Sequence, residues 1–244
     1  MLSVITVVYN NFNHIEDTIL NVLKLKENNN LEYIIIDGGS TDGTCNVIEK
    51  YKNEISCFIS EPDKGIYDAM NKGVNLAKGE WLIFMNSGDL FYNNKNQILN
   101  LSFLDKQETK EFDIIYGNTL TKNGGKIVKV PQLNIRPNYF FLDTICHQSV
   151  FFNKRVFHNV GYYNLDYKII SDRDLLFRVA KSNGKFHHVD YIITVWDEEG
   201  FSKENISLFR LEDLLFIQQN FRFFERNYLF FERRFKSALK KILK

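Results

Sequence analysis

The sequence lacks several features that would restrict its class. Its three cysteines, Cys45, Cys57 and Cys146, lie far apart and do not have the paired spacing of a zinc site or a disulfide framework. No stretch reaches the roughly 18 consecutive apolar residues that a membrane-spanning helix needs. The first ten residues do not follow the pattern of a signal peptide. We therefore expect a cytoplasmic protein.

The chain also lacks an excess of charge of one sign. It has 31 Lys and Arg residues against 30 Asp and Glu residues, a formal net charge of +1, so we expect no nucleic-acid partner. The distribution is nevertheless uneven. Residues 221–244 contain eight basic and two acidic residues, a net charge of +6. This segment is the candidate for contact with an anionic surface.

Apolar residues alternate between the spacing of strands and that of helices. Predicted strands cover residues 3–9, 32–36, 55–59 and 81–85, and predicted helices cover residues 14–25, 41–51 and 66–77. Such alternation predicts parallel strands joined by right-handed crossovers, with ligands at the carboxyl ends of the strands.

Shorter apolar pieces follow, which indicate mixed or antiparallel strands. They cover residues 113–116, 126–130 and 149–152, before a helix at 172–182 and a strand at 187–195. The pattern predicts one α/β domain over residues 1–205, with a mixed sheet flanked by helices.

Residues 206–244 are predicted to form a basic, aromatic-rich helical extension. From Leu214 to Ile242, apolar residues recur every three or four positions, as in one long amphipathic helix. Such a helix could dock on the preceding domain, form a coiled coil or lie on an anionic membrane. The sequence leaves these roles open.

Polar clusters follow the predicted strands at the positions where ligands would bind. After the second strand, Asp37 begins a glycine-rich turn and can accept hydrogen bonds from a base or ribose. Lys64 precedes a helix start and could contact a diphosphate. Asp89 ends the turn after the fourth strand and suits a hard cation. Taken singly, each cluster is also compatible with an ordinary turn.

A further acidic cluster lies at the predicted start of the helix over residues 172–182. Asp172 or Asp174 could accept a proton from an acceptor hydroxyl, or either could interact with the helix N-terminus. By themselves, the two residues cannot be ranked.

The combined motifs resemble bacterial family 2 glycosyltransferases of the kind found in surface polysaccharide, O-antigen and capsule gene clusters. The matching segments are VVYN (7–10), IDGGSTDGT (36–44), EPDKGIYDAMNKG (61–73), NSGD (86–89) and SDRD (171–174). The resemblance implies a Rossmann-like GT-A fold and a nucleoside-diphosphate-sugar donor, with a UDP-sugar favoured. It also implies transfer of a hexosyl or N-acetylhexosaminyl group with inversion, to a hydroxyl of a glycan or a polyprenyl-diphosphate-linked acceptor.

The resemblance also assigns roles to individual positions. It implies a donor-binding set of Val8, Tyr9, Asn10, Asp37, Lys64, Asn71, Asn86 and Ser87. Asp89 would bind Mg²⁺ or Mn²⁺, and Asp172 would be the general base, with Asp174 as the competing candidate. His147 and Gln148 would lie on the acceptor or diphosphate side. One departure is that Asn86 and Gly88 occupy positions where the family often has carboxylates.

Other classes fit less well. A dinucleotide-dependent oxidoreductase should have glycines after the first strand, where this chain has Tyr9, Asn10 and Asn11. A nucleotidyltransferase is disfavoured because the glycine-rich turn follows the second strand. The remaining alternative is a non-catalytic transferase-fold subunit of a membrane-associated polysaccharide assembly complex. For either role, we expect the protein in the cytoplasm, with the inner face of the cytoplasmic membrane as a candidate location.

Overall fold

The computed structural model describes residues 1–93, 99–122, 125, 127–128, 135–196, 205–222 and 225–227, except for the side chain of Leu142. The strands are β1 (Leu2–Val8), β2 (Leu31–Asp37), β3 (Cys57–Ser60), β4 (Trp81–Phe84), β5 (Leu90–Phe91), β6 (Ile114–Thr121), β7 (Ile127–Val128), β8 (Val150–Asn153) and β9 (Phe186–Trp196). The α-helices are α1 (Phe12–Lys26), α2 (Thr44–Glu49), α3 (Ile66–Leu76), α4 (Tyr139–Leu142), α5 (Arg155–Asn159), α6 (Ser171–Lys181) and α8 (Ile206–Asn220). Short 3₁₀ helices are η1 (Leu101–Asp105), η2 (Gln107–Glu111) and η3 (His147–Ser149).

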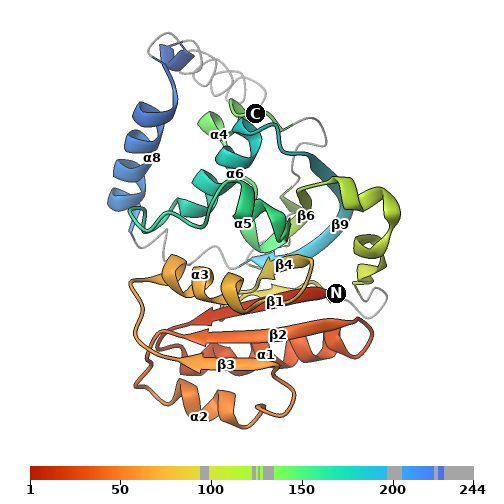
Figure 1. The fold of residues 1–244 in the computed structure, drawn as a ribbon. Helices are drawn as coiled ribbons and strands as arrows, with labels where there is room; N and C mark the ends of the chain where they lie inside the picture. Colours follow the sequence, from red (N-terminus) through yellow and green to blue (C-terminus); the bar gives the residue numbers. More distant parts are fainter. Residues whose placement is uncertain are drawn as a thin grey trace.

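The strands form one mixed sheet in the order β3-β2-β1-β4-β8-β6-β9-β5, and β7 pairs with β6 (Figure 1). The strands β3, β2, β1 and β4 are parallel. Beyond them, β8 is antiparallel to both β4 and β6, while β6 and β9 are parallel. The prediction of a parallel first half followed by mixed strands is therefore confirmed.

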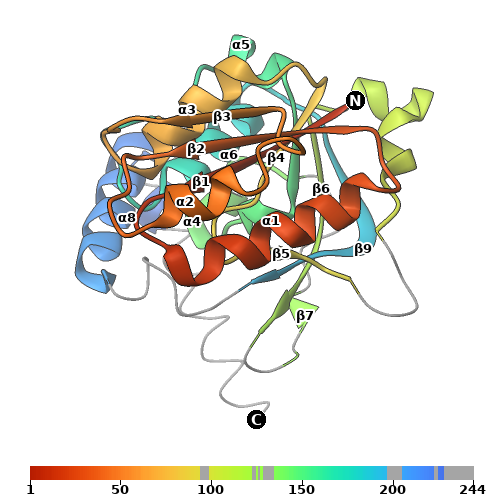
Figure 2. The ribbon, with the colours of Figure 1, turned by 90° about the horizontal axis from the view of Figure 1, so that it is seen from below.

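Both faces of the sheet are buried, which explains why β1 and β2 are apolar along nearly their whole length. Ile5 and Val7 of β1 belong to the core that α3 and α6 cover. Val4 and Val8 point the other way, into the core that α1 and α2 cover (Figure 2). This alternation follows from the two-residue period of a strand. Because both faces are buried, the polar side chains that could bind a ligand lie at the strand ends.

Several short elements were not predicted. The strand β5 has two residues, and η1, η2, α4 and α5 have four or five residues each. Elements of this length span about one helical turn or less, so they contain too little apolar periodicity to be detected. Of these elements, only β5 joins the sheet, as the edge strand that pairs with β9.

The prediction of one continuous helix through the C-terminal extension is wrong at Phe221. The helix α8 ends at Asn220, and Phe221 has extended φ and ψ angles of −123° and 136°. Phe221 is buried against Phe141 and Phe177, so its burial in the core takes precedence over continuation of the helix. Residues 228–244, the rest of the predicted stripe, lie outside the described part of the chain.

The face of α8 that packs inward also differs from the predicted stripe. Leu214 is 57% exposed, whereas Phe216 is fully buried. The two side chains are about 200° apart around the helix axis, so only one of them can face the core. Among the described helices, none is both long and apolar enough to cross a bilayer.

Candidate active site

The turns after the parallel strands meet at one edge of the sheet because the strands are in register. Val8 is paired with Asp37, and Asp37 with Ser60, at the carboxyl ends of three neighbouring strands. Asn10 joins the first two turns. Its backbone N–H donates to Ser40 Oγ at 2.7 Å, and its side-chain oxygen accepts from the Thr41 N–H at 2.9 Å.

Asp37 lies at the centre of the glycine-rich turn and is fully buried. Its carboxylate accepts hydrogen bonds from the N–H groups of Gly39 and Ser40, the hydroxyls of Ser40 and Ser60, and the thiol of Cys45. Burial acts to raise the pKa of Asp37, but these donors outweigh burial and lower the pKa. In this arrangement Asp37 shapes the turn, and its carboxylate oxygens are already engaged.

An exposed surface suited to a base lies beside this turn. Tyr9 is 65% exposed, and its ring comes within 3.4 Å of where a Cβ on Gly38 would be. The Asp63 carboxylate lies even closer to that position, at 2.5 Å, so a larger residue at Gly38 would collide with it. Asp63 is a candidate that the sequence analysis missed, and the EPDKG segment that contains it was the available signal.

The two other predicted donor residues after β3 have different surroundings. Lys64 is exposed, and its backbone N–H donates to Asp68 Oδ2 at 3.0 Å. Asn71 is bound at both ends of its amide by the backbone of Tyr163, each contact being 3.0 Å. Asn71 therefore ties α3 to the segment before α6, while Lys64 is placed at the surface near the helix start.

The turn at residues 86–89 is held against η3. The Gln148 side chain donates to Asp89 Oδ2 at 2.9 Å, and both residues are buried. His147 Nε2 lies 3.5 Å from Asn86 Nδ2. The predicted metal residue and the His147–Gln148 pair, which are far apart in the sequence, are thus brought together.

His147 also links this turn to Asp172 at the start of α6. His147 Nδ1 lies 3.8 Å from Asp172 Oδ2. Burial lowers the pKa of His147, although the charge of Asp172 partly opposes the shift. The imidazole is therefore neutral near pH 7, so it does not give Asp172 a cationic partner.

Tyr67 contacts Asp172 from the other side, a contact that the sequence analysis did not anticipate. Its hydroxyl lies 2.6 Å from the Ile169 carbonyl oxygen and 3.2 Å from Asp172 Oδ1. Burial and the charge of Asp172 raise the pKa of Tyr67 well above its usual value, so the hydroxyl stays protonated and can donate. The tyrosine within the GIYDAMNKG helix start was the available signal.

The two acidic candidates on α6 face different surroundings. Asp174 is buried and forms an ion pair with Arg178 at 2.8 Å, and the Arg178 guanidinium also donates to the Tyr162 carbonyl oxygen at 2.8 Å. Asp172 instead faces His147 and Tyr67, with 17% of its side chain exposed. The contacts therefore favour Asp172 as the residue that an acceptor can reach.

The side chains around Asp89 offer oxygen atoms, which are the ligands that a hard divalent cation prefers. The part of the chain that the structure describes contains no group of three or more His, Cys, Asp or Glu residues that could hold a metal. Within the same residues, Asn86 Oδ1 and Ser87 Oγ are buried without a hydrogen-bond partner. A carboxylate with two nearby polar residues suits Mg²⁺ or Mn²⁺, which take further ligands from phosphates and water.

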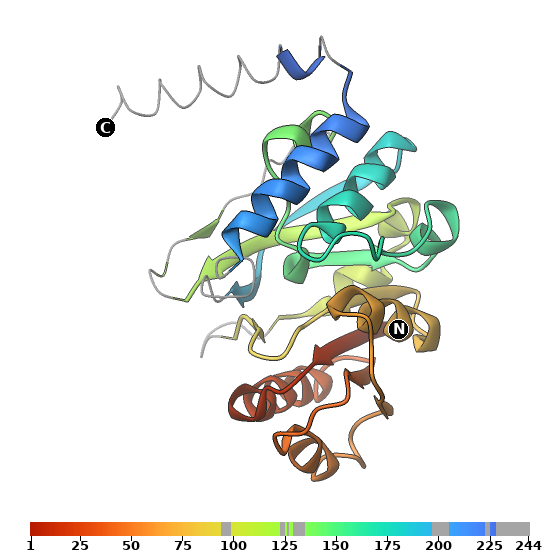
Figure 3. The same ribbon diagram turned by 90° about the vertical axis from the view of Figure 1, so that its left-hand side faces the viewer.

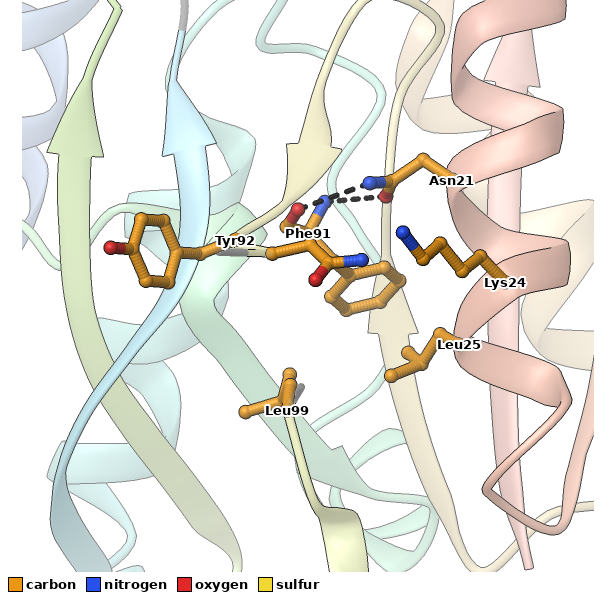
Figure 4. A pocket seen from close by; sticks show the side chains of 7 residues that line it. Asn21, Lys24, Leu25, Phe91, Tyr92 and Leu99 are labelled. Carbon is orange, nitrogen blue, oxygen red and sulfur yellow. Dashed lines mark hydrogen bonds between the residues drawn. The ribbon is translucent and has the colours of Figure 1, made fainter. Parts of the chain in front are cut away.

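A small pocket between α1 and β5 lies outside this polar cluster (Figure 4). It is lined by Asn21, Lys24, Leu25, Phe91, Tyr92, Asn93 and Leu99. The Asn21 amide both donates to and accepts from the backbone of Phe91, at 3.1 and 2.8 Å. These contacts join α1 to β5 and provide no catalytic group.

Comparison with protein families agrees with this arrangement. Residues 3–167 match the family described as Glycosyl transferase family 2. The chain belongs to this family. The family assignment expected from the motifs is therefore confirmed.

Curated relatives include other members of the family. The PGL/p-HBAD biosynthesis glycosyltransferase of Mycobacterium bovis is 32% identical over 154 residues, which cover 60% of this chain and 57% of that protein. An uncharacterized glycosyltransferase of Mycobacterium tuberculosis is 27% identical over 191 residues, covering 73% of this chain and 68% of the relative. The chain thus spans little more than half the length of the first of these relatives.

Solved structures show the same fold at low sequence identity. Staphylococcus aureus TarS 1-349 in complex with UDP-GlcNAc has a TM-score of 0.64 at 18% identity, over 95% of this chain and 71% of that chain. The mannosyltransferase PcManGT of Pyrobaculum calidifontis, in complex with GDP-Man and Mn²⁺, has a TM-score of 0.62 at 17% identity, over 84% of this chain and 59% of that one. The expected GT-A fold is therefore confirmed.

Proposed function

We propose that this protein is an inverting glycosyltransferase that moves a hexosyl or N-acetylhexosaminyl group from a nucleoside-diphosphate sugar to a hydroxyl of a glycan or lipid-linked acceptor. One observation carries the proposal. The turn at residues 86–89, the His147–Gln148 pair and Asp172 converge at the carboxyl edge of the sheet in a member of this family. Ligands bind at this edge in open α/β sheets.

The donor would lie along the turns after β1, β2 and β3. Tyr9 offers an exposed ring for stacking on a base, and Asp63 beside it can accept a hydrogen bond from the base or ribose. Lys64 would approach the diphosphate. UDP is the favoured nucleotide because a structural neighbour is bound to UDP-GlcNAc, although another is bound to GDP-Man. Asp37 and Asn10 would act by holding these turns in shape.

Asp89 would hold a divalent cation, with Asn86 and Ser87 as neighbouring oxygen donors. When bound with the donor, such an ion would stabilise negative charge on the departing nucleoside diphosphate. Gln148 holds one oxygen of the Asp89 carboxylate at 2.9 Å and so fixes its orientation.

Asp172 would act as the general base. Its carboxylate would take the proton of the acceptor hydroxyl as that oxygen forms a bond to the anomeric carbon. The bond from this carbon to the diphosphate oxygen breaks in the same displacement, so the configuration inverts and no enzyme-bound sugar forms. Tyr67 would hold one carboxylate oxygen of Asp172, and neutral His147 would lie beside the other.

The donor and the base can be tested together. UDP- and GDP-sugars, with and without Mn²⁺, are screened by thermal shift and hydrolysis, because a ligand that binds the folded state raises its apparent stability. Asp172→Asn should then abolish transfer while leaving donor affinity largely intact, and retained turnover would exclude Asp172 as the base. The absence of a shift with any donor would favour the alternative of a non-catalytic subunit.

We also propose that the C-terminal extension contacts the inner face of the cytoplasmic membrane. Leu211 and Leu214 are 54% and 57% exposed on α8, and residues 221–244 are strongly basic in sequence. The double variant Leu211→Glu, Leu214→Glu should reduce flotation with anionic liposomes. Leu20→Glu, at an exposed position of α1, should not reduce flotation. Equal flotation of both variants and the parent protein would contradict membrane contact.

A further inference from the structure

The helix that carries Asp172 begins without a side-chain cap of its own. Its N-cap residue is Ile170, whose apolar side chain cannot accept a hydrogen bond. The carboxylate of Glu212, on α8, accepts instead from the backbone N–H groups of Lys168, Ile169 and Ile170 at 2.7, 2.9 and 3.2 Å. A residue about 40 positions later in the chain therefore holds the three residues that lead into α6, whereas a local N-cap side chain would accept from N–H groups inside the first turn.

Glu212 is only 4% exposed, and this burial makes its contacts specific. A buried carboxylate is costly unless hydrogen-bond donors surround it. Three consecutive N–H groups next to a helix N-terminus supply those donors together with a favourable dipole. The three N–H groups therefore suit a carboxylate such as that of Glu212, which can only accept hydrogen bonds.

A second contact connects α8 to the residue that follows Asp172. Asp213 forms an ion pair with Arg173, which is 6% exposed and also donates from Nε to the Phe140 carbonyl oxygen at 2.6 Å. The Arg173 guanidinium lies 4.8 Å from the centre of the Phe216 ring. The helices α6 and α8 run side by side in Figures 1 and 3. Through Glu212 and Asp213, α8 therefore contacts the chain both before and after Asp172.

We propose that Glu212 is a positioning residue that sets the location of the Asp172 carboxylate, with Asp213 as its auxiliary. The inference rests on the proposed role of Asp172 as the base. The coupling passes through Tyr67, whose hydroxyl contacts both the Ile169 carbonyl and Asp172. A shift of residues 168–170 would therefore alter the base and its hydrogen-bond donor together. The segment 206–221 is consequently part of the catalytic apparatus.

The test compares two buried glutamates that cap backbone amides at different places. In Glu212→Gln, an amide NH₂ replaces one of two acceptor oxygens and faces backbone donors. Glu32→Gln is the matched control. Glu32 lies at the start of β2, away from the site, and it is also buried and accepts from the Gly79 N–H at 3.0 Å. Glu212→Gln should lower kcat by about 10- to 100-fold with the donor KM unchanged, whereas Glu32→Gln should leave kcat intact.

Hydrogen exchange of the amides at residues 168–170 supplies a readout that does not require activity. Their protection should fall at least about tenfold in Glu212→Gln and stay unchanged in Glu32→Gln. Unchanged protection, or a kcat equal to that of the parent protein, would overturn the inference. If Glu212→Gln does not fold, Asp213→Asn is tested in its place, because Asp213 is more exposed than Glu212. An unchanged kcat in Asp213→Asn would likewise overturn the inference.

The two proposals can fail separately. If Asp172→Asn retains turnover, the base assignment is wrong, yet the exchange measurement still reports whether Glu212 holds residues 168–170. If Asp172→Asn is inactive while Glu212→Gln is fully active, the base assignment stands and the positioning role is wrong.

Discussion

Removal of the Tyr67 hydroxyl should lower kcat as well as the stability of the fold. Tyr67→Phe keeps the ring, which stacks on Tyr163 at 5.5 Å, and deletes the contacts to the Ile169 carbonyl and Asp172. Loss of a hydrogen bond to a charged group costs about 2 kcal/mol. In a domain of this size that loss corresponds to a fall in Tm of roughly 4–8 °C. Loss of an oriented Asp172 should lower kcat by about tenfold, equivalent to about 1.4 kcal/mol of barrier.

Tyr33→Phe is the control for this prediction. Tyr33 is fully buried, and its hydroxyl lies 3.1 Å from Thr6 Oγ1, in the core that α1 and α2 cover. Both variants are assayed by thermal unfolding, and by initial rates at saturating donor and acceptor well below either Tm. Tyr33→Phe should lose about 1 kcal/mol of stability, because its partner is neutral, and keep its kcat. Equal kcat values for Tyr67→Phe and the parent protein would refute the positioning of Asp172 by this hydroxyl.

Two further predictions concern protonation and metal binding. Because burial lowers the pKa of His147 below its ordinary value of 6.5, the unfolded chain binds this proton first, so the free energy of unfolding should decrease as pH falls below 6.5. Urea titrations should show a shallower decrease in His147→Gln than in the parent protein; identical slopes in the two proteins would contradict the prediction. Asp89→Asn should abolish the additional thermal stabilisation that Mn²⁺ provides in the presence of UDP. Asp17→Asn, at an exposed position of α1, should retain that stabilisation. Persistence of the Mn²⁺ effect in Asp89→Asn would place the ion elsewhere.

The alternation of strands and helices could be predicted because it depends on local periodicity. The apolar runs that became β1 and β2 are buried on both faces, and the spacing in α1 and α3 matches one buried helix face. The polar turns after these strands were also found from the sequence, since asparagines follow the first run and aspartate, glycine and serine follow the second. Their convergence at one sheet edge followed from the expected parallel pairing.

The C-terminal extension shows where periodicity fails. Leu214 and Phe216 are both apolar and face different sides of α8, and the sequence contains no information on which of the two meets the core. The aromatic cluster around Phe177 selects Phe216 and then Phe221, at the cost of helix continuity. Packing against a distant surface overrides local helical preference in this case.

The sequence by itself determined the family, the fold class and the segments that carry polar chemistry, because these depend on patterns within short stretches. The family resemblance placed Asp172 ahead of Asp174, and only the tertiary structure showed how the surroundings of the two residues differ. Two residues apart on a helix, their side chains point about 200° from each other, so one faces His147 while the other faces Arg178. The tertiary structure likewise brought Glu212 to the start of α6. Contacts between distant segments arise from how whole elements pack, which no local pattern records.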